Sequence, residues 1–196
     1  MQYSILLMHG SGAGHSSRFM SDWAQLLEAA GVKVHRVTFP YMQAIERSGR
    51  KRPPERFNVL CDVVEEHIHE LANANEPLLL AGKSLGGRVA MACRDLARVK
   101  GAVAFGYPFH PPAKPLQVRM APLVECSAPG LILQGERDPF GKVAEVQAYT
   151  MPSWVSVQWL AGADHDFTTL KSFGQSQHQV LETATSAMLQ WMATLK

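Results

Sequence analysis

The stretch LLLAGKSLGGR, residues 78–88, carries two overlapping motifs. Its Gly82-Lys83-Ser84 matches the end of a phosphate-binding loop, G-x-x-x-x-G-K-[ST], whose lysine and serine contact a nucleotide and its magnesium ion. The wider run from Gly82 to Gly86 matches G-x-S-x-G, a strand–turn–helix motif that presents a serine as a nucleophile. The residues on either side of the stretch decide between these two interpretations.

The surrounding residues argue against a nucleotide site, both here and in the glycine-rich segment near the N-terminus. A phosphate-binding loop that ended at Ser84 would need a glycine at position 77, where the chain has Pro77. Residues 78–81 are apolar strand formers, so no flexible loop can present N–H groups to phosphates. The segment that begins at Gly10 is a poor dinucleotide-binding fingerprint, because its last glycine position is His15 and no acidic residue ends the next predicted strand.

The secondary structure predicted around Ser84 favours the nucleophile motif. A short apolar run at 77–83 is typical of a central parallel strand, and a helix pattern extends from after Ser84 to about Arg98. The sharp turn strains the serine backbone, and the glycines two before and two after it remove Cβ atoms that would clash. At the start of the helix, the N–H of Leu85 can stabilise negative charge. We therefore predict that Ser84 is a nucleophile.

A serine nucleophile needs a base and an acid, and with this motif they follow in the order Asp or Glu, then His. Asp138 in LILQGERDPFG comes just beyond one predicted strand, and His165 in WLAGADHDF comes just beyond the next. Asp138 would hold the imidazole ring in the required tautomer, and His165 would accept the Ser84 proton. These three residues are the predicted catalytic group.

Other acidic and histidine side chains fit these roles less well. Asp164 and Asp166 flank His165 in the chain, where a neighbouring side chain cannot readily orient the ring, and we expect them to cap the turn. The remaining candidates lack the position after a strand end or lie two apart on one helix, and they are Glu136, Asp62, His67 and His69.

The loop after the first predicted strand should supply the second donor of an oxyanion hole. There the chain reads His9-Gly10-Ser11-Gly12, and its glycines let the backbone approach a substrate closely. We assign the donor beside Leu85 to the backbone N–H of Ser11, with that of Gly12 as the alternative. His9 is expected to brace the loop.

Strand and helix patterns alternate along the rest of the chain. Strands are predicted at 3–9, 32–39, 77–83, 101–107, 130–135 and 155–160, and helices at 17–30, 55–74, 84–98, 141–150 and 175–194. Residues 40–56 are predicted to be an irregular basic loop. The alternation predicts an α/β fold in one domain spanning residues 1–196, with a mostly parallel sheet of about six strands and helices on both faces. In such sheets the chemistry lies at the carboxyl ends of the strands.

The composition is that of an ordinary globular protein, with 46% hydrophobic and 18% charged residues. A formal net charge of +2 gives no reason to expect nucleic-acid binding. The three cysteines, at 61, 93 and 126, form no C-x-x-C pair, and neither a disulfide framework, a metal site nor a cofactor is expected. The N-terminus does not resemble a signal peptide and no apolar run approaches a membrane span, so we expect a cytoplasmic protein. The sequence indicates no obligatory protein partner.

Seven phrases, in order along the chain, carry a family resemblance. They are HGSGAGHSS, TFPYM, RPP, GKSLGGRVA, GYPFHPP, QGERDPFG and DHDF. With the three catalytic candidates placed, the chain resembles the α/β-hydrolase superfamily, and within it the small family of testis-expressed protein 30 and the KAT8 regulatory NSL complex subunit 3. The resemblance implies a minimal hydrolase fold with no cap domain and a Ser–Asp–His triad.

The chain departs from the usual pattern of the superfamily in two respects. It is also similar to dienelactone-hydrolase-type enzymes, which have a cysteine at the position of Ser84. Six strands are counted in place of the usual eight, and the chain begins where the third strand would stand. The NSL branch serves as a subunit of a complex, so the resemblance alone does not decide the function.

Loops must form the substrate pocket of a fold that has no cap. Seven side chains on or near these loops could line it, although we expect more than half to be ordinary core: Phe19, Met20, Tyr41, Met42, Phe109, Phe140 and Phe167. The basic run Arg47, Arg50, Lys51, Arg52 and Arg56 is expected to be a solvated loop. Lys83 is expected to point away from the nucleophile and to pack or pair locally, and Arg88 to be structural.

Two functions are compatible with these residues. In the first, the protein is a serine hydrolase that cleaves a small-molecule carboxylic ester or thioester through an acyl-enzyme. In the second, it is a non-catalytic interaction module or complex subunit that keeps the fold. The intact triad and the glycine-rich loop favour the hydrolase.

Overall fold

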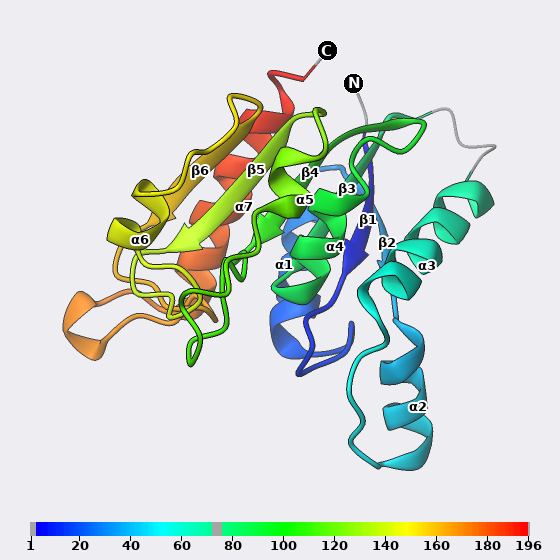
Figure 1. The fold of residues 1–196 in the computed structure, drawn as a ribbon, viewed down its shortest axis with the longest axis horizontal. Helices are drawn as coiled ribbons and strands as arrows, with labels where there is room; N and C mark the ends of the chain where they lie inside the picture. Colours follow the sequence, from blue (N-terminus) through cyan, green and yellow to red (C-terminus); the bar gives the residue numbers. More distant parts are fainter. Residues whose placement is uncertain (1–2, 72–75, 196) are drawn as a thin grey trace.

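The computed structural model describes residues 3–71 and 76–195, and these residues form a six-stranded parallel sheet of order β2-β1-β3-β4-β5-β6. The strands are β1 (Ser4–Met8), β2 (Lys33–Val37), β3 (Leu78–Lys83), β4 (Val99–Phe105), β5 (Gly130–Gly135) and β6 (Val155–Leu160). Because every strand runs in the same direction, all six carboxyl ends meet at one edge of the sheet (Figure 1). The predicted fold class is confirmed.

Helices cover both faces of the sheet (Figure 1). α1 (Arg18–Ala29) and α7 (Gln177–Met192) pack against one face, and α3 (Phe57–Glu70) and α4 (Leu85–Ala92) against the other. In the part of the chain that the structure describes, no helix is long and apolar enough to cross a membrane.

The central strand β3 shows why the chain folds into three layers. All six of its residues are buried, and successive side chains of a strand point to opposite faces. Leu79 and Ala81 belong to the buried cluster that contains Trp23 of α1, whereas Leu80 belongs to the cluster that contains Val64 of α3. A continuous apolar run is therefore what a strand covered on both sides requires.

The prediction of an irregular loop over residues 40–56 is wrong for its first half. Pro40–Ser48 form the helix α2, which projects at the carboxyl end of β2 (Figure 1). Pro40 occupies the first turn, where its missing N–H costs nothing, and Gly49 ends the helix with a left-handed φ of 66°. The same proline and glycine that indicated a loop are helix boundary residues here, and Tyr41 anchors the helix in the core.

The helix after Ser84 is shorter than predicted, because it ends at Ala92 and not near Arg98. The chain must turn back to enter β4 at Val99, and Arg98 adopts a positive φ of 73° in that turn. Arg94 holds the turn from inside the protein. Its fully buried guanidinium donates hydrogen bonds to backbone carbonyls of Met91, Pro122, Leu123, Cys126 and Ala128.

The remaining elements lie close to their predicted positions. α3 is shorter than the predicted 55–74, and the end of that prediction falls on residues 72–75, which lie outside the described residues. α6 (Val143–Gln147) is the core of the helix predicted at 141–150. Two short elements have no counterpart in the prediction, namely α5 (Ala121–Val124) and a 3₁₀ turn (Lys171–Phe173).

Candidate active site

Ser84 lies at the sharp turn between β3 and α4. Its backbone has φ 51° and ψ −109°, a conformation that few residues other than glycine adopt. The Ser84 N–H donates to the carbonyl of Phe105 on β4 at 2.9 Å, and helix α4 begins at the next residue, Leu85. The surroundings therefore hold the serine in a strained conformation at the carboxyl edge of the sheet.

Two glycines allow the turn to be this tight. A Cβ atom on Gly82 would lie 2.2 Å from the backbone carbon of Gly86, and one on Gly86 would lie 2.6 Å from the carbonyl oxygen of His9. Both distances are far inside van der Waals contact, and both involve backbone that cannot rotate away. The G-x-S-x-G spacing is thus a steric requirement of this turn.

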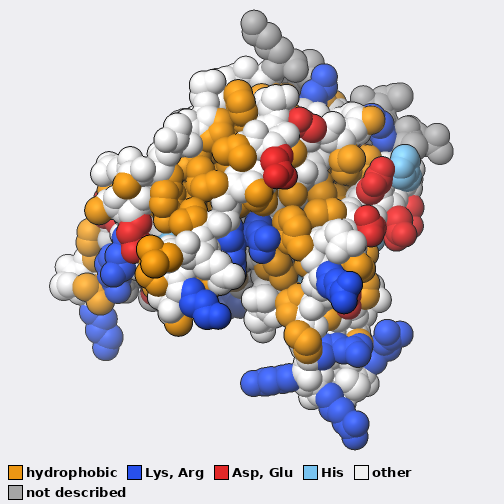
Figure 2. Space-filling model, in the orientation of Figure 1, with side chains coloured by type: hydrophobic (Ala, Val, Ile, Leu, Met, Phe, Trp, Pro, Cys, Tyr) orange, Lys and Arg blue, Asp and Glu red, His pale blue; other side chains and the backbone are white. Residues whose placement is uncertain are grey.

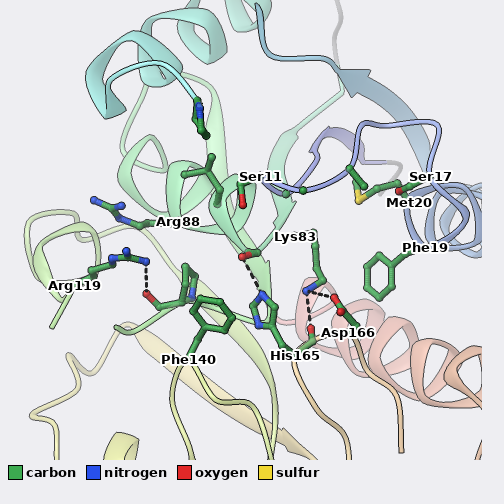
Figure 3. A pocket seen from close by; sticks show the side chains of 17 residues that line it. Ser11, Ser17, Phe19, Met20, Lys83, Arg88, Arg119, Phe140, His165 and Asp166 are labelled. Carbon is green, nitrogen blue, oxygen red and sulfur yellow. Dashed lines mark hydrogen bonds and ion pairs between the residues drawn. The ribbon is translucent and has the colours of Figure 1, made fainter. Parts of the chain in front are cut away.

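Ser84, His165 and Asp138 form a continuous chain of hydrogen bonds. Nε2 of His165 lies 3.0 Å from Oγ of Ser84, and Nδ1 of His165 lies 2.8 Å from Oδ2 of Asp138. Figure 3 shows His165 among the residues that line the cavity. An ionised carboxylate can only accept a hydrogen bond, so Nδ1 carries the proton and Nε2 is left to accept one from the serine. The structure thus brings together the three predicted residues from three separate loops.

The carboxylate of Asp138 is fully buried and has further donors. Its Oδ2 accepts a hydrogen bond from Nε2 of Gln134 at 2.9 Å, and its Oδ1 accepts one from the backbone N–H of Phe140 at 2.8 Å. The Phe140 ring also lies 4.3 Å from the His165 ring, centroid to centroid. Gln134 was assigned no role from the sequence, although its position on β5 before Asp138 places it on the same strand end.

The loop at residues 9–12 lies beside Ser84, as predicted. Gly10, Ser11, Gly12 and Leu85 all line the cavity onto which Ser84 opens. The ring of His9 braces this loop through two contacts with backbone atoms. Its Nδ1 lies 2.7 Å from the carbonyl oxygen of Gly10, and its Nε2 accepts a hydrogen bond from the Phe39 N–H at 3.1 Å.

His9 is the neutral form of histidine in this arrangement. An imidazole that accepts at Nε2 must carry its proton on Nδ1, which then donates to Gly10. The ring is fully buried, and this burial lowers the pKa of His9 below the value of an ordinary histidine.

Lys83 pairs locally, as expected, but it does not point away from the site. Its Nζ donates to the carbonyl oxygen of His165 at 2.5 Å and lies 3.3 Å from Oδ1 of Asp166, and the side chain lines the same cavity as Ser84 (Figure 3). Burial lowers the pKa of Lys83, while the Asp166 carboxylate opposes that change. The lysine thus ties the end of β3 to the backbone of the loop that carries His165.

The two aspartates beside His165 have different roles. Oδ1 of Asp164 accepts hydrogen bonds from the backbone N–H groups of Asp166 and Thr168, so Asp164 caps the turn as predicted. Asp166 was expected to do the same, but it faces Lys83. Neither carboxylate takes the position that Asp138 holds at the imidazole ring.

A cavity of about 630 Å³ lies in front of Ser84. Of the seven side chains predicted as possible lining residues, Phe19, Met20 and Phe140 line it. The other four are buried in the core, as expected for more than half of them, and they are Tyr41, Met42, Phe109 and Phe167.

Two arginines also line the cavity. Arg88, expected to be structural, stacks on the ring of Phe57 with its guanidinium carbon 4.1 Å from the centroid, yet it reaches the cavity as well. Arg119 was not predicted, because it follows β4 only after a long proline-rich segment. Figure 3 shows the two guanidinium groups near each other on one side of the site.

The basic run lies elsewhere. Its five members are all exposed, and none lines the cavity in front of Ser84: Arg47, Arg50, Lys51, Arg52 and Arg56. Figure 2 shows Lys and Arg side chains projecting from the end of the molecule that α2 and the following segment form. This placement agrees with a solvated basic segment.

Comparisons with known proteins agree with the fold. A lidless α/β serine hydrolase from Xanthomonas campestris superposes with a TM-score of 0.70 at 13% identity, over 95% of this chain and 82% of that chain. Dienelactone hydrolase from Anabaena variabilis gives a TM-score of 0.70 at 19% identity, over 100% and 88% of the two chains. Est1E from Butyrivibrio proteoclasticus gives 0.69 at 14% identity, over 98% and 89%.

The sequence comparisons give the family. No protein in the curated collection of sequences matches this chain. The profile of a known family, described as an alpha/beta hydrolase domain, matches residues 1–193, which is nearly the whole chain. The match agrees with the six-stranded parallel sheet and with the structural relatives that lack a lid. The chain therefore belongs to the alpha/beta hydrolase family.

Proposed function

We propose that the protein is a serine hydrolase that cleaves a carboxylic ester or thioester through an acyl-enzyme, with Ser84 as the nucleophile. The observation that carries this proposal is the hydrogen-bonded chain from Ser84 through His165 to the buried Asp138, with distances of 3.0 and 2.8 Å. A serine hydroxyl is a weak nucleophile unless a base can take its proton, and this geometry supplies the base. The serine opens onto a cavity that can admit a small molecule.

In the acylation step, Ser84 Oγ attacks the carbonyl carbon of the substrate as its proton passes to Nε2 of His165. The carbonyl oxygen becomes an oxyanion, which the N–H groups of Leu85 and Ser11, or of Gly12 in place of Ser11, would bind. Asp138 stabilises the imidazolium without accepting its proton. The bond to the leaving group then breaks, and His165 gives the proton to the departing alcohol or thiol.

In the deacylation step, water takes the place of the alcohol or thiol. His165 accepts a proton from this water as its oxygen attacks the acyl carbon, and the oxyanion forms again in the same position. Collapse of the intermediate breaks the bond to Oγ of Ser84, and His165 returns the proton to that oxygen. The products are a carboxylic acid and the free enzyme, so one water is consumed in each turnover.

A fluorophosphonate probe tests the proposal, since it reacts covalently with activated serines. Wild-type protein and a Ser156→Ala control, whose serine lies exposed on β6, should both be labelled, and digestion should locate the adduct on the peptide that contains Ser84. Ser84→Ala should not be labelled. Equal labelling of Ser84→Ala and wild type, or no labelling of either, would contradict the proposal, and the second outcome is the one that a non-catalytic interaction module predicts.

We further infer that the chain falls within the small branch that resembles testis-expressed protein 30 and the NSL complex subunit. The seven ordered phrases support this placement. Several of them supply residues of the site, because HGSGAGHSS contributes the loop beside Ser84 and QGERDPFG contributes Asp138.

A further inference from the structure

No carboxylate in the described part of the chain pairs with the guanidinium group of Arg88. Arg88 lies on α4, one helical turn after Ser84, and stacks on the Phe57 ring. Its Nε atom is buried and finds no hydrogen-bond acceptor among the residues that the structure describes. A buried N–H without an acceptor costs about 1–3 kcal/mol, so such a group is rare unless something else supplies the acceptor.

Arg119 reaches the same part of the cavity from a different element. Its backbone is fixed on both sides, because its N–H donates to the carbonyl of Phe109 at 2.7 Å and its own carbonyl accepts from the Tyr107 hydroxyl at 2.8 Å. Within residues 3–71 and 76–195, its side chain donates a single hydrogen bond, a long one of 3.5 Å to the carbonyl of Pro108. The loop after β4 therefore positions Arg119 firmly but leaves most of its donors free.

Arg94 shows what a purely structural arginine looks like in this protein. Its guanidinium is fully buried, and each of its three nitrogens donates to a backbone carbonyl. In the described part of the chain, Arg88 and Arg119 lack such a set of backbone acceptors. Among the residues that the structure describes, neither of them forms an ion pair with a carboxylate.

Placing two guanidinium groups together in one cavity is unfavourable without an anion between them. Burial lowers the pKa of Arg119, and the nearby positive charge of Arg88 lowers it further. A bound carboxylate or phosphate would reverse this cost, because planar guanidinium groups match the geometry of oxyanions.

The cavity is also polarised across the catalytic residues. Figure 3 shows Arg88 and Arg119 on one side of His165, whereas Phe19, Met20 and the ion pair of Lys83 with Asp166 lie on the other side. A substrate whose reacting carbonyl sits at Ser84 would therefore place one end against two cations without carboxylate partners, and the other end against apolar side chains and a lysine that Asp166 already neutralises.

We propose that Arg88 and Arg119 form a binding site for an oxyanion, carboxylate or phosphate, at one end of the ester or thioester substrate. The two arginines then determine specificity, because an uncharged substrate leaves both guanidinium groups in the cavity without a partner. This inference rests on the proposed hydrolase function and narrows it to esters that carry an anionic group.

Matched pairs of esters test the inference. In the first pair, monophenyl adipate carries its anion on the acyl half, and methyl phenyl adipate is its neutral counterpart. In the second pair, 4-acetoxybenzoate carries its anion on the leaving group, and methyl 4-acetoxybenzoate is its neutral counterpart. The ester 4-acetoxyphenyl phosphate distinguishes phosphate from carboxylate. In wild-type protein, kcat/KM for the anionic member should exceed that for the neutral member by about tenfold or more in at least one case.

The ratio of the two kcat/KM values is the measurement to compare between variants. Arg88→Gln and Arg119→Gln should each bring the ratio close to one. Arg36→Gln, which removes the same charge from an exposed position on β2, should leave the ratio at its wild-type value. Because only a ratio is compared, partial loss of folded protein does not affect the result.

The outcomes separate this inference from the function on which it rests. If wild-type protein cleaves the neutral esters and shows no higher kcat/KM for any anionic ester, the inference is overturned and the hydrolase function stands. The same holds if the preference for an anionic ester persists in both Arg88→Gln and Arg119→Gln. If wild-type protein cleaves no ester, the hydrolase function fails. Titration calorimetry of monophenyl adipate with Ser84→Ala then tests the anion site alone, and binding that Arg88→Gln and Arg119→Gln do not weaken overturns it.

Discussion

The chemistry of the site depends on which proton each histidine carries. In the proposed mechanism, His165 holds its proton on Nδ1, facing Asp138, so that Nε2 can take the proton of Ser84. His9 has the same tautomer for a structural reason, since its Nδ1 faces the Gly10 carbonyl and its Nε2 accepts from Phe39. The proposed mechanism requires His165 to gain a proton in every turnover, whereas His9 must stay neutral for the loop at residues 9–12 to keep these hydrogen bonds.

A buried neutral histidine makes stability depend on pH. The pKa of His9 is lowered in the folded protein, so below about pH 6.5 the unfolded chain binds a proton that the folded chain resists. The free energy of unfolding should therefore fall as the pH drops below that value. Each unit by which the pKa is lowered corresponds to about 1.4 kcal/mol at full effect.

The variant His9→Gln isolates this contribution, because glutamine can still accept from Phe39 but does not titrate. Urea unfolding at about pH 7.5 and about pH 5 should show a smaller loss of stability in the variant than in wild type. The comparison uses the change with pH, so a constant destabilisation by the substitution cancels. An equal pH dependence in both proteins would show that His9 is not held neutral by the fold.

At the scale of elements, the close approach of β1, β3 and α4 forms the turn at Ser84. A Cβ on Gly86 would lie 2.6 Å from the carbonyl oxygens of Met8 and His9, at the end of β1. These are backbone atoms of a central strand, so the helix itself would have to move. Any such movement displaces both Ser84 and the N–H of Leu85.

The variant Gly86→Ala should therefore destabilise the protein despite the better helix propensity of alanine. That propensity contributes at most about 1 kcal/mol, whereas overpacking typically costs about 1–3 kcal/mol and occasionally more, and the fixed backbone around Gly86 favours the upper part of that range. Gly12→Ala is the control, since nothing lies within 4 Å of its Cβ position, and its stability should match wild type. Thermal unfolding measures both, and a Gly86→Ala protein as stable as wild type would contradict the steric account of this turn.

The elements that the sequence predicts well are those with a strong periodic pattern. The helices α1, α3 and α7 are long and amphipathic, and the strands are either short apolar runs or, like β2 and β6, alternate between apolar and polar residues, so the residues alone predict them. α2 was missed because Pro40 and Gly49 mark helix ends as readily as loops, and only the burial of Tyr41 and Met42 decides between the two. α4 was made too long because the contacts that end it are formed by Arg94 with distant residues.

At the scale of the whole molecule, the parallel sheet brings the residues of the candidate site together. Ser84, Asp138 and His165 follow β3, β5 and β6, whose carboxyl ends share one edge, so a correct strand assignment was enough to place all three together. Arg119 could not be placed this way, because its position depends on how the segment after β4 folds back. Gln134 likewise gains its role only from the contact with Asp138.

The turnover of p-nitrophenyl acetate by wild type, Ser84→Ala and His165→Ala tests the central claim most directly. If Ser84 attacks the ester and His165 takes its proton, either substitution should lower kcat by at least about 10³, with the folded structure retained. The exposed Ser156→Ala variant should turn over the ester as wild type does. Activity in Ser84→Ala or His165→Ala comparable to that of wild type would contradict the assignment of these residues as nucleophile and base.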